Sequence, residues 1–341
     1  MPLPVKQRNL LSESPPSAKY IEKQTSIPTP VGKRIAIRLC TDSEHLAKFF
    51  AMNWPANILP EKSDATIIAL KESPVSYGLS PDFQGSRWFC SKTNQVWMFG
   101  NEFYGNIKIT VRGLCSEIAP LNQMFMHGCS LSIDGHGVVL SGTSGAGKTT
   151  LTTALRQMLG KRAQIVNDDW GICSLADGRL QFTGEPYLHM KYPSVHALAP
   201  DLEISPLTHL SENFNGDLND PRARLLIAAQ QVFGRNGLAN QVKLHLFVVV
   251  IRDPDAPAGA RYLSERDVTL IKQGKYSRFY DRTEWFLNGS LFITDKSRQE
   301  REISRHKLLL EKFPCVIINN IVKTPFFRTP FLRVSLLDTT V

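Results

Sequence analysis

Apolar residues recur along the second part of the chain with two different spacings, which predict an alternation of strands and helices. The segments 129–133 and 137–140 have the pattern of strands, and Asp134-Gly135 between them predicts a tight turn. Apolar residues at helical spacing across 151–159 predict a helix soon after the second strand. The apolar segment 163–167 then predicts a buried strand.

Further along, the same criteria predict more elements of both kinds. Gly160 is expected to end the first helix, and Ala176-Asp177-Gly178 predicts a hairpin turn. Asp220-Pro221 predicts the start of a helix that carries its apolar residues on one face and ends at Gly234. The remaining expected elements are a central strand at 242–251, a helix from the capping box Ser297 to Glu300 that Pro314 ends, and a late strand at 315–318.

We therefore expect an α/β fold in which a small domain precedes a larger one. Residues 1–31 are rich in Pro, Ser and Lys and are expected to form a flexible tail, because they bury little apolar surface. Residues 32–120 contain short apolar pieces, at 35–39, 95–99 and 107–111, which predict a small strand-rich domain. Residues 121–341 are expected to form a catalytic domain.

The composition narrows the classes of partner without choosing one. A hydrophobic fraction of 42% with 21% charged residues is ordinary for a globular protein. Forty Lys and Arg against 31 Asp and Glu give a net charge of +9, which attracts anions such as nucleotides, acidic proteins or polynucleotides. The sequence has no recognisable zinc-finger or aromatic RNA-binding signature, which argues against a nucleic-acid partner.

The cysteines and the start of the chain bear on the compartment. The six cysteines are scattered singly, which is typical of free thiols in a reducing compartment rather than of a zinc or redox site. The first 20 residues lack the apolar stretch of a secretory signal, and no run is long enough to cross a bilayer. We expect a cytoplasmic protein that makes no membrane contact, and the sequence leaves a homo-oligomer open.

The segment Gly142 to Thr149 satisfies the pattern G-x-x-x-x-G-K-[ST] of a phosphate-binding P-loop. Its glycines allow the tight turn that points successive backbone N–H groups at phosphate oxygens. Lys148 is expected to neutralise the β- and γ-phosphates, and Thr149 to place its hydroxyl on Mg²⁺. A glycine-rich turn without a ligand is the alternative, which the predicted strand before the loop and helix after it disfavour. The residues expected to contact the nucleotide are Gly142, Thr143, Ser144, Gly145, Ala146, Gly147, Lys148, Thr149 and Thr150.

Two adjacent acids, Asp168 and Asp169, follow the strand predicted at 163–167. Side chains of successive strand residues diverge, so one carboxylate can hold a metal ion while the other accepts a proton from an attacking hydroxyl. Alone, such a pair is commonly a solvated turn or a helix cap. Its position one helix downstream of a phosphate loop favours metal and phosphate chemistry. By spacing alone, His127 is more typical of a structural histidine than of a functional one.

Three ordered elements resemble the nucleotide-binding core shared by HPr kinase and phosphoenolpyruvate carboxykinase. The stretch MHGCSLSIDGHGVVLSGTSGAGKTTLTTAL is followed by QIVNDDWG, and the resemblance covers residues 124–195. HPr kinases carry a histidine-glycine pair, a hairpin, a GxSGxGKS loop and a strand ending in two aspartates. His127-Gly128, Gly142 to Thr149 and Asp168-Asp169 match these elements. The carboxykinases have a similar methionine-histidine-cysteine start, a GLSGTGKTTL loop and a GDDEHGW element.

The resemblance implies a P-loop core with a mixed sheet of the carboxykinase and HPr kinase type. It also implies an ATP- and Mg²⁺-dependent kinase that transfers the γ-phosphate to a hydroxyl of a protein or small molecule, with Mn²⁺ as an alternative cation. His127 then belongs to the active site, and Lys148 stabilises charge on the transferring group. We assign Asp168 as the base or orienter, and Asp169 with Thr149 as the metal ligands, while the reverse order of the two aspartates stays open.

Two departures from the resemblance leave the phosphate acceptor open. The chain shows no counterpart to the arginine-bearing substrate segment of the carboxykinases, and the HPr kinase signature beyond the aspartates is not evident. Glu185 and Lys191 lie where carboxykinases have a glutamate and a lysine, or are simply surface residues on a strand. The alternatives are therefore a carboxykinase-like enzyme acting on an oxo acid and a non-catalytic module that senses a nucleotide. The choice between adenine and guanine also stays open.

Overall fold

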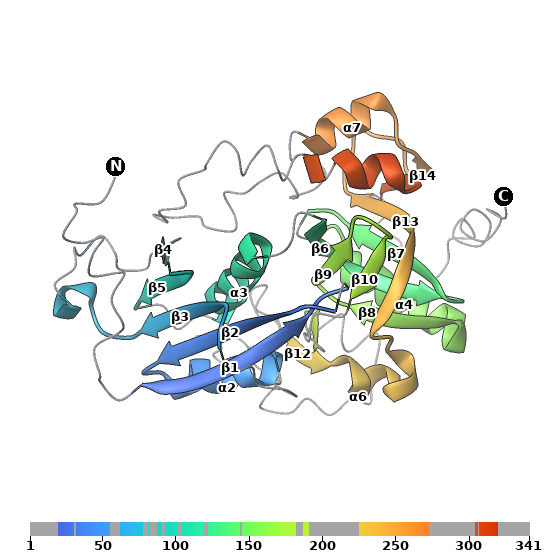
Figure 1. Cartoon of the computed structure of the whole chain (residues 1–341). Helices are drawn as coiled ribbons and strands as arrows, with labels where there is room; N and C mark the ends of the chain where they lie inside the picture. Colours follow the sequence, from blue (N-terminus) through green and yellow to red (C-terminus); the bar gives the residue numbers. More distant parts are fainter. Residues whose placement is uncertain are drawn as a thin grey trace.

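A computed structural model shows an α/β protein built from two mixed β-sheets with helices packed on them (Figure 1). The expected α/β class is thereby confirmed. The structure describes residues 20–30, 32–54, 62–77, 81, 87–90, 93–100, 104–118, 122–143, 145–181, 187–190, 225–272, 304–305 and 307–319.

The first sheet has five strands in the order β1-β2-β3-β5-β4. β2, β3 and β5 run parallel in its centre, and the two edge strands are antiparallel to their neighbours. Ser43 caps the first turn of helix α2 by accepting a hydrogen bond from the backbone of Leu46. The bounds are β1 Ile21–Pro28, β2 Arg34–Thr41, α2 Glu44–Asn53, β3 Ala65–Leu70, a 3₁₀ turn Pro74–Tyr77, β4 Arg87–Cys90, β5 Gln95–Phe99 and α3 Tyr104–Ile118.

β1 overturns part of the expected flexible tail. The sequence predicts a tail through residue 31, but residues 21–28 pair with β2 along their whole length. The segment reads as a tail because it is largely polar, yet its buried polar groups find partners. The Thr25 hydroxyl donates to the Trp54 carbonyl at 2.8 Å, and Arg34 donates to both the hydroxyl and the carbonyl of Ser26. These hydrogen bonds offset the cost of burying polar groups.

Helix α3 corrects the strand expected at 107–111. The β-branched run there has strand propensity, but Ile107, Val111 and Leu114 recur at helical spacing and are fully buried. Tertiary packing therefore outweighs the local preference for a strand. α3 contacts β2 and β3 of the first sheet and β6 of the second, so it lies between the two sheets (Figure 1).

The second sheet has eight strands, of which seven follow the order β10-β9-β6-β7-β13-β15-β14, while β8 pairs with β6. β10 pairs with both β9 and β13, so the sheet curls on itself there. The strands predicted at 129–133, 137–140, 163–167, 242–251 and 315–318 are confirmed, as is the hairpin turn at 176–178. The bounds are β6 Gln123–Ile133, β7 His136–Ser141, α4 Lys148–Leu159, a 3₁₀ turn Gly160–Arg162, β8 Ala163–Asn167, β9 Trp170–Ser174, β10 Arg179–Gln181, β13 Gln241–Ile251, β14 Gly259–Tyr262, α7 Glu265–Lys272 and β15 Cys315–Asn319.

The helix expected between Asp220 and Gly234 is wrong at residues 225–228 and confirmed at residues 229–233. Residues 225–228 form strand β12, Leu225–Ala228, which pairs with β11, Tyr187–Met190. Helix α6, Ala229–Phe233, has five residues and ends at Gly234 as predicted, before a 3₁₀ turn at Arg235–Gly237. The short apolar run that precedes α6 is compatible with either element, and only the partner strand decides. Asp220-Pro221 and the capping box 297–300 lie outside the described residues.

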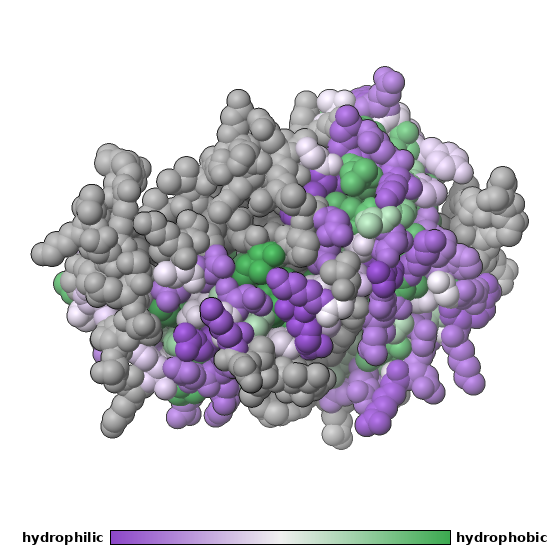
Figure 2. Space-filling view, in the orientation of Figure 1, coloured by the Kyte–Doolittle hydropathy of each residue, from purple (hydrophilic) through white to green (hydrophobic). Residues whose placement is uncertain are grey.

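Three large apolar clusters hold the elements together. One packs α2, α3 and the first sheet against Trp170 and Ile172 of β9, so the core of the first sheet extends into the second. The other two fill the two faces of the second sheet, one of them beneath α4. Figure 2 shows that hydrophilic residues cover most of the described surface on one face of the molecule. Within the described residues, no helix is long and apolar enough to cross a membrane.

The inclusion of β1 in the core can be tested at Ile27, whose exposed fraction is 2%. We expect Ile27→Ala to lower the free energy of unfolding by about 2–5 kcal/mol, as a cavity in a packed core does. Val75→Ala is the control, since Val75 is 55% exposed, and its effect should stay within about 0.5 kcal/mol. Urea unfolding measures both. Equal stability of the two variants would show that residues 21–28 are not part of the core.

Candidate functional site at the glycine-rich loop and the acid pair

The glycine-rich loop connects β7 to the N-terminus of α4. Gly142 has φ 150°, and a Cβ at this position would lie 2.1 Å from the carbonyl oxygen of Val250 in β13. A side chain there cannot fit beside the neighbouring strand. Gly147, with φ 99°, leads directly into the helix. Lys148 is buried and its ammonium donates to the carbonyls of Gly142 and Thr143 at 2.9 and 3.1 Å, so its charge lies inside the loop.

The two acids occupy a kink in a nearly continuous strand. β8 and β9 pair one after the other with the same strand, β6. The pairs Ser130–Asn167 and His127–Trp170 flank the kink. The two β6 residues between them, 128 and 129, therefore face the two acids. The acid pair is thus inside the sheet, where the sequence predicted only the end of a strand.

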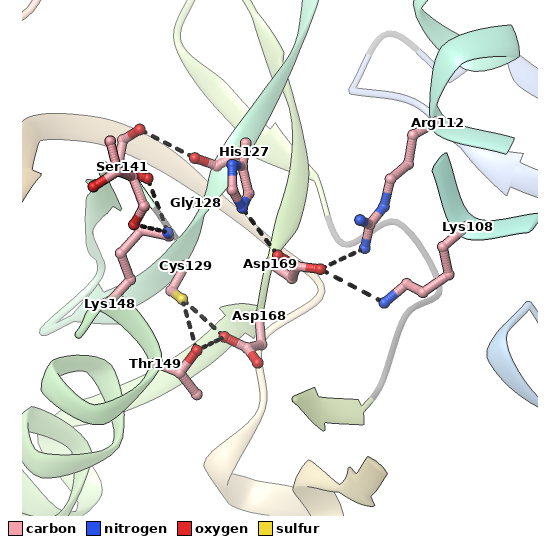
Figure 3. Close-up of polar contacts among 12 residues, drawn as sticks. Lys108, Arg112, His127, Gly128, Cys129, Ser141, Lys148, Thr149, Asp168 and Asp169 are labelled. Atoms are coloured by element: carbon pink, nitrogen blue, oxygen red, sulfur yellow. Dashed lines mark hydrogen bonds and ion pairs between the residues drawn. The ribbon is translucent and has the colours of Figure 1, made fainter. Parts of the chain in front are cut away.

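The backbone at the kink turns the two carboxylates apart. Asp169 has φ 71°, in the left-handed region that residues other than glycine rarely adopt. The Trp170 N–H donates to the Asp168 carbonyl at 2.9 Å, which is the hydrogen bond of a tight three-residue turn. The Gly128 N–H donates to the Asp169 carbonyl at 2.9 Å and ties the turn to β6. As a result, the Asp168 and Asp169 side chains face different groups (Figure 3).

Buried side chains of the neighbouring strands support the kink. The Asn167 amide donates to the Gly128 carbonyl at 2.9 Å and its oxygen accepts from the Ser130 hydroxyl at 2.5 Å. Gly128 lies so close to β7 that an added Cβ would be 2.6 Å from the Leu140 carbonyl oxygen. A residue keeps a strained left-handed backbone only where several surrounding contacts hold it there. The hydrogen bonds of Asn167 and the close packing of Gly128 hold the kink in this way.

Asp168 faces the glycine-rich loop. Its side chain is buried, and its Oδ1 accepts a hydrogen bond from the Thr149 hydroxyl at 2.9 Å. The Cys129 thiol donates to the same oxygen at 2.8 Å and lies 3.7 Å from the Thr149 hydroxyl (Figure 3). Thr149 is the second residue of α4, so the loop helix and the kink meet at this carboxylate.

Asp169 faces the opposite way, towards α3. Its Oδ2 accepts from the Arg112 guanidinium at 2.8 Å and lies 3.8 Å from the Lys108 ammonium. Its Oδ1 lies 3.1 Å from His127 Nε2. The Lys108 and Arg112 side chains are only 3% and 7% exposed, against 26% for Asp169. Helix α3 thus brings two buried cations to one carboxylate of the second sheet.

The indole of Trp170 packs against two of the side chains that contact Asp169. The His127 ring stacks on its indole with centroids 5.4 Å apart, as expected for cross-strand neighbours. The Arg112 guanidinium carbon lies 4.7 Å from the centroid of the indole, a cation–π distance. Trp170 therefore orients two of the three groups that contact Asp169.

The surroundings set the protonation of these groups. Burial alone would raise the pKa of Asp169, but Arg112, the His127 hydrogen bond and Lys108 outweigh it and hold that pKa well below its usual range. Burial lowers the pKa of His127 below its ordinary 6.5, against the opposing effect of Asp169. The imidazole is therefore neutral near pH 7. Because an ionised carboxylate only accepts hydrogen bonds, Nε2 must carry the proton that faces Asp169.

The structure divides the predicted site residues into two groups. Lys148, Thr149 and Asp168 lie on the loop side of the kink, and His127 with Asp169 lies on the α3 side. Thr149 thus meets Asp168, whereas the sequence analysis assigned it a metal site together with Asp169. Of the other predicted contacts, Gly145 and Thr150 are exposed and Ala146 is buried, while Ser144, Glu185 and Lys191 lie outside the described residues.

Three residues of the site were not selected from the sequence. Lys108 and Arg112 lie in a segment expected to contain a strand, and no motif marks them. Cys129 belongs to the stretch that resembles the carboxykinase start, so its position two residues after His127 was a usable signal.

The side chains present suit a hard divalent cation next to a nucleotide. A carboxylate oxygen of Asp168 and the Thr149 hydroxyl are the oxygen ligands that Mg²⁺ and Mn²⁺ prefer. No group of three or more His, Cys, Asp or Glu in the described residues could hold a metal ion by itself. Mg²⁺ is commonly bound through one or two carboxylates plus substrate phosphates.

Comparisons with known proteins do not identify a family for this chain. No protein-family model matches the chain, and no curated protein matches it.

The charge balance around Asp169 can be tested with Asp169→Asn. An asparagine also adopts a left-handed backbone but removes the negative charge that Lys108 and Arg112 contact. We expect a loss of roughly 2–3 kcal/mol in the free energy of unfolding, below the range for fully buried pairs because the site is partly exposed. Adding Arg112→Met to this variant should recover part of the loss. Urea unfolding measures both variants.

Asp134→Asn is the matched control. Asp134 also has a left-handed backbone, with φ 49°, and also pairs with an arginine, Arg162, but on an exposed turn. Its substitution should cost far less than that of Asp169, because exposed pairs contribute little. Equal losses at both positions would contradict the account of Asp169 as the counter-charge of buried cations.

Proposed function

We propose that the protein is an ATP- and Mg²⁺-dependent kinase with a P-loop core of the HPr kinase and phosphoenolpyruvate carboxykinase type. It transfers the γ-phosphate to a hydroxyl group of a protein or small molecule. The contact between the Thr149 hydroxyl and Asp168, at 2.9 Å, carries the proposal. It joins the last residue of the phosphate-loop motif to an acid on a neighbouring strand, which is the arrangement that P-loop enzymes use for a cation on the phosphates.

The loop supplies the nucleotide end of the site. Backbone N–H groups at the N-terminus of α4 offer donors and positive potential for phosphate oxygens. The Lys148 ammonium bonds to two carbonyls of the loop, at 2.9 and 3.1 Å, which supports a role for it beside the phosphates. Its role in the proposal is to stabilise negative charge on the transferring group.

Thr149 and Asp168 would hold the cation in this proposal, in place of the pair Thr149 and Asp169 expected from the sequence. When bound, Mg²⁺ or Mn²⁺ neutralises charge on the phosphate oxygens. Asp169 is less suited to this task, because Arg112, Lys108 and His127 already surround its carboxylate.

The α3 side of the kink is assigned to the acceptor. Asp169 stays ionised and accepts from His127 Nε2, which orients the imidazole. A neutral, oriented imidazole can take the proton of an attacking hydroxyl, whereas a carboxylate with a strongly lowered pKa is a weak base. The role of base therefore moves from Asp168, as expected from the sequence, to the pair of His127 and Asp169.

Carboxykinase-like chemistry on an oxo acid is the second candidate. The observation in its favour is the pair of buried cations, Lys108 and Arg112, which lie beside His127 and Asp169. Positive charge at this position suits an anionic substrate.

Lys148→Ala tests the kinase proposal. For the wild type we expect ATP with Mg²⁺ to raise the melting temperature and to label an acceptor pool from radioactive ATP. Lys148→Ala should lose roughly 100-fold or more in transfer, the scale seen when one donor to the transition-state charge is removed. Lys161→Ala, at the exposed turn after α4, is the control and should behave like the wild type.

Each other outcome rejects the kinase proposal in favour of a different function. Tight ATP binding without transfer to any acceptor indicates the nucleotide-sensing module. Nucleotide-dependent decarboxylation of oxaloacetate indicates the carboxykinase-like enzyme. A melting temperature that neither ATP nor GTP changes in the presence of Mg²⁺ rejects all three.

A further inference from the structure

The proposed mechanism gives no role to Cys129, although its sulfur contacts both the Asp168 carboxylate and the Thr149 hydroxyl. Cys129 is fully buried on β6, directly across the ladder from the kink. Cys129 is a free thiol, as are Cys40, Cys115, Cys173 and Cys315. Its sulfur approaches Asp168 Oδ1 to 2.8 Å, and a hydrogen bond to a charged oxygen is among the stronger kinds.

The position of the Cys129 thiol allows it to restrain the rotation of the Asp168 carboxylate. Asp168 Oδ1 receives two hydrogen bonds from different elements, one from Thr149 on α4 and one from Cys129 on β6. A carboxylate held by a single donor can rotate about its last bond, since that torsion is broad. Two donors on separate elements fix it. The Thr149 donor is on the same hydroxyl that would bind the cation, so Cys129 is the anchor that is independent of the cation.

We propose that Cys129 is a positioning residue of the cation site: its thiol holds the Asp168 carboxylate towards Thr149 and thereby sets the affinity for Mg²⁺. This inference rests on the proposed function. It goes beyond that function because nothing in the phosphate-loop motif or in the acid pair requires a donor on β6.

The test compares Cys129→Ala with Cys129→Ser. In Cys129→Ala the donor is lost, and we expect the Mg²⁺ concentration at half-maximal rate to rise about tenfold, the scale of one hydrogen bond to a charged group. Cys129→Ser keeps a donor and should stay within about threefold of the wild type. The second readout is the Mg²⁺ concentration that gives half of the ATP-dependent rise in melting temperature, which should shift in parallel. ATP binding in the presence of a chelator should be unchanged.

Cys173→Ala is the matched control, because Cys173 is equally buried in the same sheet, and its thiol donates to the Ser174 carbonyl, away from the loop and the acid pair. It should lower stability without shifting either Mg²⁺ midpoint. If Cys129→Ala does not fold, Cys129→Val replaces it, since valine fills the space without a donor.

The outcomes separate this inference from the proposed function. A wild type that binds no ATP refutes the function itself. A wild type with a clear Mg²⁺ midpoint that Cys129→Ala leaves unchanged, while only its melting temperature falls, refutes the positioning role alone. A midpoint that rises equally in Cys129→Ala and Cys129→Ser also refutes it, because the hydrogen bond is then not the cause.

Discussion

The left-handed backbone of Asp169 is the constraint on which the site depends. Without it, Asp168 and Asp169 would belong to one regular strand. With it, the first acid faces the loop helix and the second faces α3. The conformation is uncommon for a residue with a side chain, and it is held by the ladder to β6 and by the buried amide of Asn167.

The first sheet belongs to the site as well as to the scaffold. Its helix α3 supplies Lys108 and Arg112, and its core extends to Trp170 on β9. Two buried cations would be costly alone, but the ionised Asp169 and the indole of Trp170 compensate them. The burial provided by these residues keeps His127 neutral, and Asp169 and Trp170 orient its ring. The packing between the two sheets and the chemistry proposed for the acceptor therefore depend on the same contacts.

The sequence predicts the local features of this fold well and its long-range features poorly. The hairpin before the loop, the loop helix with its end at Gly160, and the long strand at 241–251 follow from periodicity and turn residues. Three expectations were wrong because tertiary contacts decide them: β1 pairs with β2, α3 buries its β-branched residues, and residues 225–228 find a partner strand. The two acids and the divergence of their side chains were expected, but not that Asp168 meets Thr149 while Asp169 meets Arg112, because contacts between distant elements decide this. Lys108 and Arg112 could not be found, because only the packing of α3 brings them to Asp169.

The central claim is that the acid pair is divided, with Asp168 serving the nucleotide side and Asp169 the acceptor side. A crystal structure of the protein with Mg²⁺ and a non-hydrolysable ATP analogue tests it most directly. The account predicts the phosphates in the loop at Lys148, the cation beside Thr149 and Asp168, and Asp169 still paired with Arg112. A cation held by Asp169, or an analogue bound away from the loop, would contradict it.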